Sequence, residues 1–228
     1  MLGMGRTPAA ARASVPNGDS ARAERNRMRQ GLPMKTPPAR KLFAYWNERR
    51  GSRLAPERGD IEPGAIRGVL GDSFIVTFDT AAGHPFRLAG TRICALFGHE
   101  LKGKPFLQRW DEASRPLIAE LVAIVADEAI PVVAGVAART AEGSCADLEL
   151  LLLPLYHRGK THVRLLGVLA PLAVPYWLGA ERVVALTLGA TRHLGAGVEA
   201  IAAPRLVRGD AAGRVRHGLT VYDGGLEN

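Results

Sequence analysis

The chain has 228 residues, enough for one or two domains, and its charged fraction of 23% and hydrophobic fraction of 47% are those of a globular protein. It shows neither a run of about 18 uncharged apolar residues nor an apolar N-terminal signal region, so we expect no membrane span and no secretory leader. The two cysteines, Cys94 and Cys145, lack metal-ligand spacing, which favours a cytoplasmic protein without a metal site.

The net charge of +8 is concentrated at the start of the chain. Residues 1–58 hold 13 Lys and Arg and 4 Asp and Glu, whereas residues 59–228 hold 17 and 18. Residues 1–36 are rich in Ala, Arg, Pro, Gly and Ser, so we predict a disordered basic arm. Such an arm is either a solubilising tail or a weak binder of nucleic acid or an anionic membrane, and we do not expect nucleic acid as the main partner.

Residues 37–72 form the predicted N-terminal helical flank. Its first helix carries apolar side chains at helical spacing, namely Leu42, Tyr45 and Trp46, and Gly51 ends it. Because this helix lies outside the predicted sheet, we expect these three residues to form a dimer or partner surface. A second short helix is predicted to start at Asp60, which is a suitable N-cap.

Residues 73–171 contain five predicted strands. Alternating apolar residues predict a strand from Phe74, and a turn at residues 82–85 joins it to a strand at residues 86–89. A short helix follows, then a loop, then a long helix over residues 112–129 with Asp111 or Ser114 as its cap. The last three strands span residues 132–139, 148–156 and 162–169. The third of the five starts at Pro131, and the fourth is apolar on both faces, so we place it inside the sheet.

The region after the fifth strand is less regular. Residues 172–195 are predicted as a C-terminal extension, in which residues 182–188 add a possible strand. Residues 196–228 are rich in Gly, Ala and Arg, so we expect a mostly irregular tail.

The order strand, strand, short helix, loop, long helix and three strands is the order of a PAS domain. Over about residues 40–195 the chain resembles a PAS-like family common in alphaproteobacteria as short stand-alone proteins. The resemblance is carried by these stretches: Tyr45-Trp46, residues 60–63 (DIEP), 86–98 (FRLAGTRICALFG), 100–104 (ELKGK) and 175–179 (PYWLG).

The resemblance implies an α+β fold with a five-stranded antiparallel sheet in the order 2-1-5-4-3 and helices on one face, beside the N-terminal helix and flexible termini. It also implies a cytoplasmic sensor or adaptor that acts through contacts with another signalling protein or with a second copy. A small ligand is a possible regulator of these contacts.

Known PAS cofactors fit the sequence poorly. A haem site needs an axial ligand, and residues 112–129 contain no His, although His99 stays open. Flavin photochemistry needs a reactive Cys, and residues 104–109 (KPFLQR) have the Phe-Leu-Gln of such a motif without its Cys. We therefore expect neither haem nor a covalent flavin adduct, and the identity of any cofactor stays unknown.

A ligand pocket between sheet and helices would be apolar with a few polar groups. The candidate lining residues are Phe74, Val76, Leu88, Arg92, Ile93, Phe97, Leu101, Trp110, Leu121, Val136, Leu152 and Leu165. Arg92 is the best polar candidate, because an Arg can pair with an anionic ligand, but it could also lie on the surface or pair with Glu100. The alternative for the whole set is that these side chains simply fill a core.

Enzyme motifs do not occur in the sequence. It lacks Gly-x-Ser-x-Gly, a Gly-rich phosphate loop followed by Lys-Ser/Thr, and a pair of His at metal-ligand spacing. We therefore expect no catalytic residues, and a function in signalling rather than catalysis.

Overall fold

The computed structural model describes residues 34–157, 160–194, 214–216 and 219–221. Its main sheet has six antiparallel strands in the order β2-β1-β5-β4-β3-β6. These strands are β1 (Ser73–Thr77), β2 (Phe86–Ala89), β3 (Val132–Thr140), β4 (Cys145–His157), β5 (Lys160–Pro171) and β6 (Val183–His193). The first five have the predicted order 2-1-5-4-3, and β6 extends the sheet beside β3.

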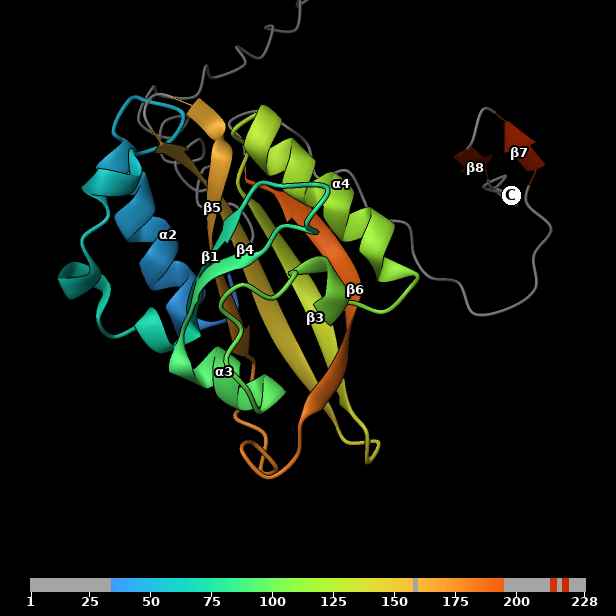
Figure 1. Cartoon of the computed structure of the whole chain (residues 1–228). Coiled ribbons are helices and arrows are strands. Elements are labelled where there is room, and N and C mark those ends of the chain that lie inside the picture. Colours follow the sequence, from blue (N-terminus) through green and yellow to red (C-terminus); the bar gives the residue numbers. More distant parts are fainter. Residues whose placement is uncertain (1–33, 158–159, 195–213, 217–218, 222–228) are drawn as a thin grey trace, which may run out of the picture.

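The helices lie on both sides of this sheet (Figure 1). Helices α3 (Thr91–Phe97) and α4 (Ser114–Asp127) cover one face, and helix α2 (Pro37–Arg50) covers the other. Short 3₁₀ helices connect these elements: η1 (Arg58–Asp60), η2 (Pro63–Ile66), η3 (Leu70–Asp72) and η4 (Leu107–Arg109). The strands β7 (Arg214–Arg216) and β8 (Leu219–Val221) pair with each other.

Strand β4 shows why the sheet is covered on both faces. Leu150 and Leu152 point into the core under α3 and α4, whereas Leu151 and Leu153 point into the core under α2. All four side chains are fully buried. Successive residues of a strand face opposite sides, so an uninterrupted apolar run requires two cores. The predicted interior position of this strand is confirmed.

Helix α2 is attached to the sheet at both ends. At its start, the buried carboxylate of Glu149 on β4 accepts hydrogen bonds from Lys35 N (2.7 Å), Thr36 N (2.8 Å) and Thr36 Oγ1 (2.7 Å). The same hydroxyl accepts a bond from Ala39 N and caps the helix. Further along, Trp46 Nε1 donates to Pro154 O on β4 at 2.9 Å. The helix is therefore an integral layer of the domain.

Two predictions for this N-terminal part need correction. The disordered arm was predicted to extend to residue 36, but Met34 and Thr36 are buried in the fold. Residues 1–33 lie outside the described part of the chain. In place of the single helix predicted from Asp60, the structure has the separate turns η1, η2 and η3. Gly64, Gly68 and Gly71 interrupt this stretch and disfavour a continuous α-helix.

The start of α4 is locked to the edge strand β6. Asp111 caps the helix, because its Oδ1 accepts from Ser114 N at 2.8 Å, and its Oδ2 accepts from Thr187 Oγ1 at 2.5 Å. Ser114 Oγ accepts in turn from Leu188 N. Burial of Asp111 opposes its ionisation, but the hydrogen bonds from Ser114 and Thr187 prevail and lower its pKa. These bonds satisfy edge groups of β6 that would otherwise lack partners.

Candidate functional site

The predicted pocket residues separate into two groups. Ten of the twelve candidates share the buried core between the sheet and helices α3 and α4, among them Phe74, Val76, Phe97, Leu101, Trp110 and Leu121. The further candidates Ile93, Val136, Leu152 and Leu165 lie in the same core. These side chains pack as core residues do, which agrees with the alternative that they simply fill a core. Contact between them and a ligand stays a prediction.

The centre of this core is an aromatic cluster. The rings of Phe74, Phe86, Phe106 and Trp110 contact one another with centroid distances of 5.5–5.7 Å. A Cβ added to Gly167 on β5 would lie 2.2 Å from the Phe74 ring, so the ring lies directly on the backbone of this glycine. The rings thereby occupy the space next to β1 and β5.

Trp110 adds an unusual polar group to this core. Its side chain is 1% exposed, and its Nε1 has no hydrogen-bond partner within the described part of the chain. A buried donor without a partner reduces stability, and a polar ligand atom or a water molecule at this position would gain a hydrogen bond.

Arg92, the best polar candidate from the sequence, is paired with a carboxylate of the same chain. Its guanidinium forms a two-point ion pair with the buried carboxylate of Asp72 in η3, in which Nε lies 2.7 Å from Oδ1. The hydrogen bond with Asp72 raises the pKa of Arg92. Arg92 thus joins α3 to η3. Its ion-pair partner is Asp72 and not Glu100, the partner considered from the sequence.

Leu88 also lies apart from the predicted pocket. It pairs across the strands with Ile75, whose side chain belongs to the core on the α2 side, and 44% of Leu88 is exposed. Its side chain therefore faces the opposite side of the sheet from the aromatic cluster.

The predicted partner surface on α2 is corrected by the structure. Leu42 and Trp46 are 0% and 2% exposed, because they pack on the α2 side of the sheet. The Tyr45 hydroxyl donates to Asp60 O and accepts from Glu62 N. In the folded chain these side chains are occupied by internal contacts.

Two glycine-containing joints position α3 and β2. Gly90 precedes α3, and a Cβ there would lie 2.1 Å from Leu70 O, so only glycine permits this close approach to η3. Gly103 N donates to Phe86 O, and Phe86 N donates to Lys104 O. The loop at residues 103–106 therefore pairs with the outer edge of β2.

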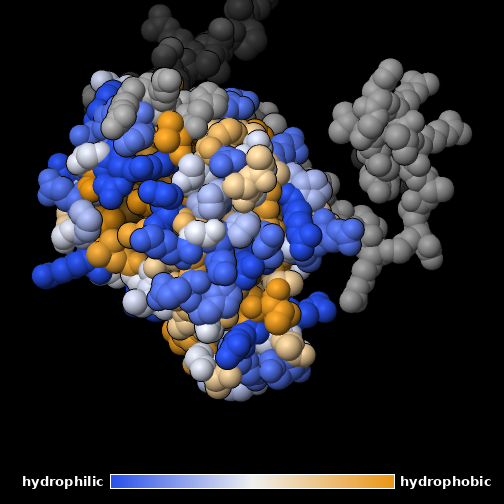
Figure 2. All heavy atoms as spheres, viewed as in Figure 1, coloured by the Kyte–Doolittle hydropathy of each residue, from blue (hydrophilic) through white to orange (hydrophobic). Residues whose placement is uncertain are grey.

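An open groove of about 290 Å³ lies on the α2 side, between the short helices and strands β1 and β2. Its apolar wall is formed by Ile61, Ile66, Leu70, Ile75, Leu88 and Leu166. Figure 2 shows hydrophobic side chains at the surface in this part of the molecule, bordered by hydrophilic ones. The volume is at the lower end of the range for small-molecule sites, about 300 Å³.

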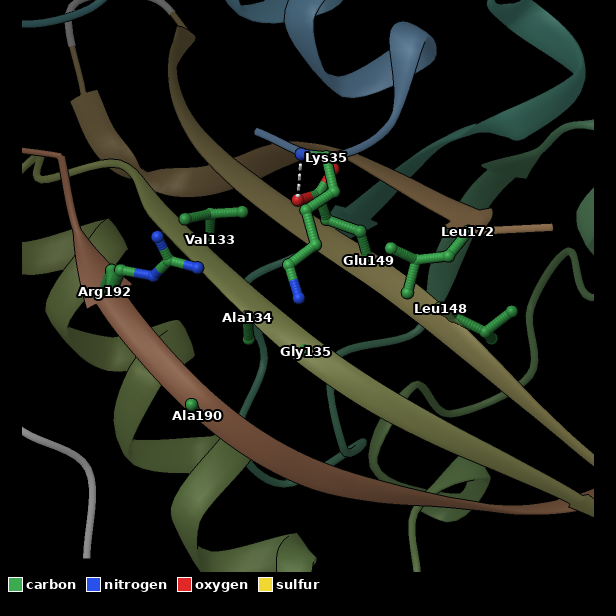
Figure 3. Close-up of a pocket in the computed structure, with 9 residues that line it drawn as sticks. All are labelled: Lys35, Val133, Ala134, Gly135, Leu148, Glu149, Leu172, Ala190 and Arg192. Atoms are coloured by element: carbon green, nitrogen blue, oxygen red, sulfur yellow. Dashed lines mark hydrogen bonds between the residues drawn. The ribbon is translucent and has the colours of Figure 1, made fainter. Parts of the chain in front are cut away.

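A second cavity, of about 60 Å³, lies over strands β4, β3 and β6. Figure 3 shows the side chains of Lys35 and Arg192 extending over this part of the sheet, next to Glu149. Its volume admits little more than a few water molecules, which makes it a poor candidate for an organic ligand.

An exposed apolar row follows β5. Leu172, Val174 and Tyr176 are 43%, 77% and 93% exposed, whereas the next residue, Trp177, is 3% exposed. Leu172 N donates to Asp147 O, and Ala180 N and Glu181 N both donate to Trp177 O. The segment is thus anchored at both ends while its apolar side chains face solvent.

The described ranges do not contain a metal-binding cluster. They contain no group of three or more His, Cys, Asp or Glu side chains that could hold a metal ion. Cys94 is buried, and burial raises the pKa of its thiol. None of the helices described is both long and apolar enough to span a membrane.

Sequence reasoning missed both the groove and the exposed row. The groove is built from Ile61, Ile66 and Leu88, which come from separate segments whose spacing gives no common signal. Leu172, Val174 and Tyr176 were assigned no role, because hydropathy alone does not show which apolar side chains remain outside. The motif at residues 175–179 drew attention to this place without a role for it.

Comparison with known proteins assigns the family. The PAS domain family model matches residues 34–170, and the described fold has its strand order. Among curated proteins nothing matches.

Solved structures with similar folds include PAS and light-oxygen-voltage domains. A PAS domain from Colwellia psychrerythraea has 17% identity and a TM-score of 0.35, covering 48% of this chain and 97% of that one. A light-oxygen-voltage protein from Rhodobacter sphaeroides has 20% identity and a TM-score of 0.35, covering 46% and 60%. The assignment rests on the family model, which spans more than half of the sequence: the chain belongs to the PAS domain family.

Proposed function

We propose that this PAS domain is a non-catalytic signalling module whose output is a contact with another protein chain, and that a small ligand controls this contact. The PAS fold supports a sensory or signalling role. The observation that carries the proposal is the exposed row of Leu172, Val174 and Tyr176.

These three side chains have the properties of an interface. Neighbouring exposed apolar side chains on a soluble protein mark contact sites, and Tyr is enriched among the residues that contribute most to binding. The buried Trp177 holds the segment in place, so little conformational entropy is lost when a partner binds. A second copy is the simplest partner, because a short extended row can meet the same row of another copy across a two-fold axis.

Ligand control is supported by the way the groove connects to this row. Leu166 lines the groove on β5, and the same strand continues to Pro171 and into the row. On the other side, Thr91 at the start of α3 lines the groove. The end of α3 packs on Arg182, since a Cβ at Gly98 would lie 2.7 Å from the Arg182 side chain. Elements that touch a ligand in the groove therefore lead to both ends of the exposed segment.

Sedimentation equilibrium of the full chain tests the contact. The wild type is expected to dimerise at micromolar concentration, and the double variant Val174→Ser/Tyr176→Ser to remain monomeric. The control is Leu117→Ser on α4, an apolar residue that is also exposed, at 42%. A wild type that stays monomeric, or a double variant that dimerises as well as the wild type, would reject the row as the contact surface.

A further inference from the structure

The groove between the short helices and strands β1 and β2 has an aliphatic interior. Its floor is formed by Ile75 and Leu166, and Leu88 lies at its open side with 44% of its surface exposed. Among the described residues that line it, Phe74 alone is aromatic, and its ring packs with Phe86 in the opposite core. The groove thus offers a surface for a hydrocarbon chain rather than rings for stacking.

One charged side chain takes part in lining this groove. Arg58 forms no ion pair within the described part of the chain, and its Nη1 makes only a long contact of 3.4 Å with Ile61 O. Arg92, in contrast, is committed to Asp72. A guanidinium without a carboxylate partner beside an apolar surface is suited to bind a carboxylate with two hydrogen bonds.

We propose that the groove binds a medium-chain alkyl carboxylate, with its hydrocarbon chain against Ile75, Leu88 and Leu166 and its carboxylate paired with Arg58. The volume of about 290 Å³ suits a chain of this class, and binding would cover the exposed part of Leu88. This ligand class deepens the proposed function, because it names the small molecule that would control the contact, and it rests on that function for its role in signalling.

Calorimetric titration of the full chain with alkyl ligands below their micelle concentrations tests the ligand class. Decanoate is expected to bind, and octanoate to bind about fifteenfold more weakly, because each buried methylene contributes about fourfold. Decanol, which has the chain without the charge, is expected to bind about tenfold more weakly than decanoate. Lack of decanoate binding at millimolar concentration overturns the site, and equal binding of decanol and decanoate overturns the role of the carboxylate.

Two pairs of variants locate the binding. Arg58→Gln is expected to remove the preference for decanoate over decanol, whereas Arg67→Gln, an exposed arginine outside the lining, retains it. Leu88→Asp is expected to weaken decanoate binding at least tenfold, whereas Leu117→Asp on α4 has no effect. Leu88 and Leu117 are both partly exposed, so we expect both Asp variants to fold, and thermal unfolding checks this. Unchanged affinity in both Arg58→Gln and Leu88→Asp places the binding elsewhere and overturns the proposal.

The experiments distinguish a failure of the proposed ligand site from a failure of the proposed contact between chains. Decanoate is expected to bind the Val174→Ser/Tyr176→Ser variant, because these residues lie outside the groove lining. If decanoate binds while the wild type never dimerises, the proposed contact is wrong and the site stands. If dimerisation occurs without any decanoate binding, the ligand class is wrong and the contact stands.

Discussion

Glu149 on the central strand β4 holds Thr36, the residue that caps α2, through two hydrogen bonds of 2.7 and 2.8 Å to one carboxylate oxygen. The two residues are 113 positions apart in the sequence. Their contact closes the α2 side of the sheet, and the carboxylate is only 4% exposed. The N-terminal helix is thereby built into the domain by a buried polar contact as well as by its apolar side.

Replacing Glu149 by Gln is expected to lower the free energy of unfolding by about 2 kcal/mol. The carboxylate accepts three hydrogen bonds from Lys35 and Thr36, and an amide offers one acceptor oxygen and an unwanted donor group. Urea denaturation measures the change. Asp147→Asn, an exposed position on the same strand, is the control and should change stability by less than about 0.5 kcal/mol. Equal losses for the two variants would show that the buried contact with Thr36 is not important.

Two of the buried tryptophans, Trp46 and Trp110, allow a matched comparison. Trp46→Phe loses the hydrogen bond to Pro154 O, whereas Trp110→Phe loses none, since Trp110 Nε1 has no partner in the described part of the chain. Trp46→Phe is therefore expected to be the more destabilising variant by about 1 kcal/mol, measured by thermal or urea unfolding. A larger loss for Trp110→Phe would indicate that its indole nitrogen is satisfied in solution.

His84 is expected to make stability depend on pH. Burial lowers the pKa of His84, and this effect outweighs the charge of Asp79, which raises it. The Nδ1 atom of His84 accepts a hydrogen bond from Asp79 N, and only the neutral ring can accept this bond. The folded pKa is therefore below the unfolded value near 6.5. Its contribution to stability is complete above that value and declines as the pH falls below it, because the unfolded state then binds the proton more strongly.

The His84→Asn variant tests this dependence. His84 has a φ of 56°, a conformation that Asn accepts readily, and an Asn oxygen can replace the ring nitrogen as acceptor. Between pH 7 and pH 5 the unfolding free energy of the variant is expected to fall less than that of the wild type. Identical slopes for the variant and the wild type would contradict this account of His84.

Gly90 is expected to tolerate no side chain. A Cβ there would lie 2.1 Å from Leu70 O and 2.4 Å from Gly71 O, so Gly90→Ala must push α3 away from η3. We expect a loss of about 3 kcal/mol or more in urea unfolding. At Gly68 an added Cβ meets no atom within 4 Å, and Gly68→Ala should be neutral or slightly stabilising. Comparable stability of the two variants would contradict the close packing of this joint.

Local patterns predicted much of the fold. The alternation of Phe74 and Val76 with Ile75 identified a strand, and the apolar run at residues 150–153 identified an interior strand. Asp111 was one of the two caps proposed for the long helix. The resemblance to PAS domains then supplied the strand order, which local patterns do not contain. These features depend on neighbouring residues or on a known family, and the structure confirms them.

The rest depends on contacts between distant residues. The apolar face of α2 was recognised, but periodicity does not distinguish a helix that packs on its own sheet from one that binds a partner. From the sequence, Glu100 was the acidic partner open to Arg92, but the partner in the structure is Asp72, because α3 packs against η3. The groove and the exposed row form only when the chain folds, so local sequence patterns do not reveal either of them.

The central claim, that a ligand in the groove controls a contact between chains, is tested most directly by the dimer dissociation constant with and without decanoate. Sedimentation equilibrium at saturating decanoate is expected to change this constant about fivefold or more, as typical coupling energies imply. The Leu88→Asp variant, which keeps the exposed row, should show no such change. A wild-type constant that stays the same at saturating decanoate would contradict the account.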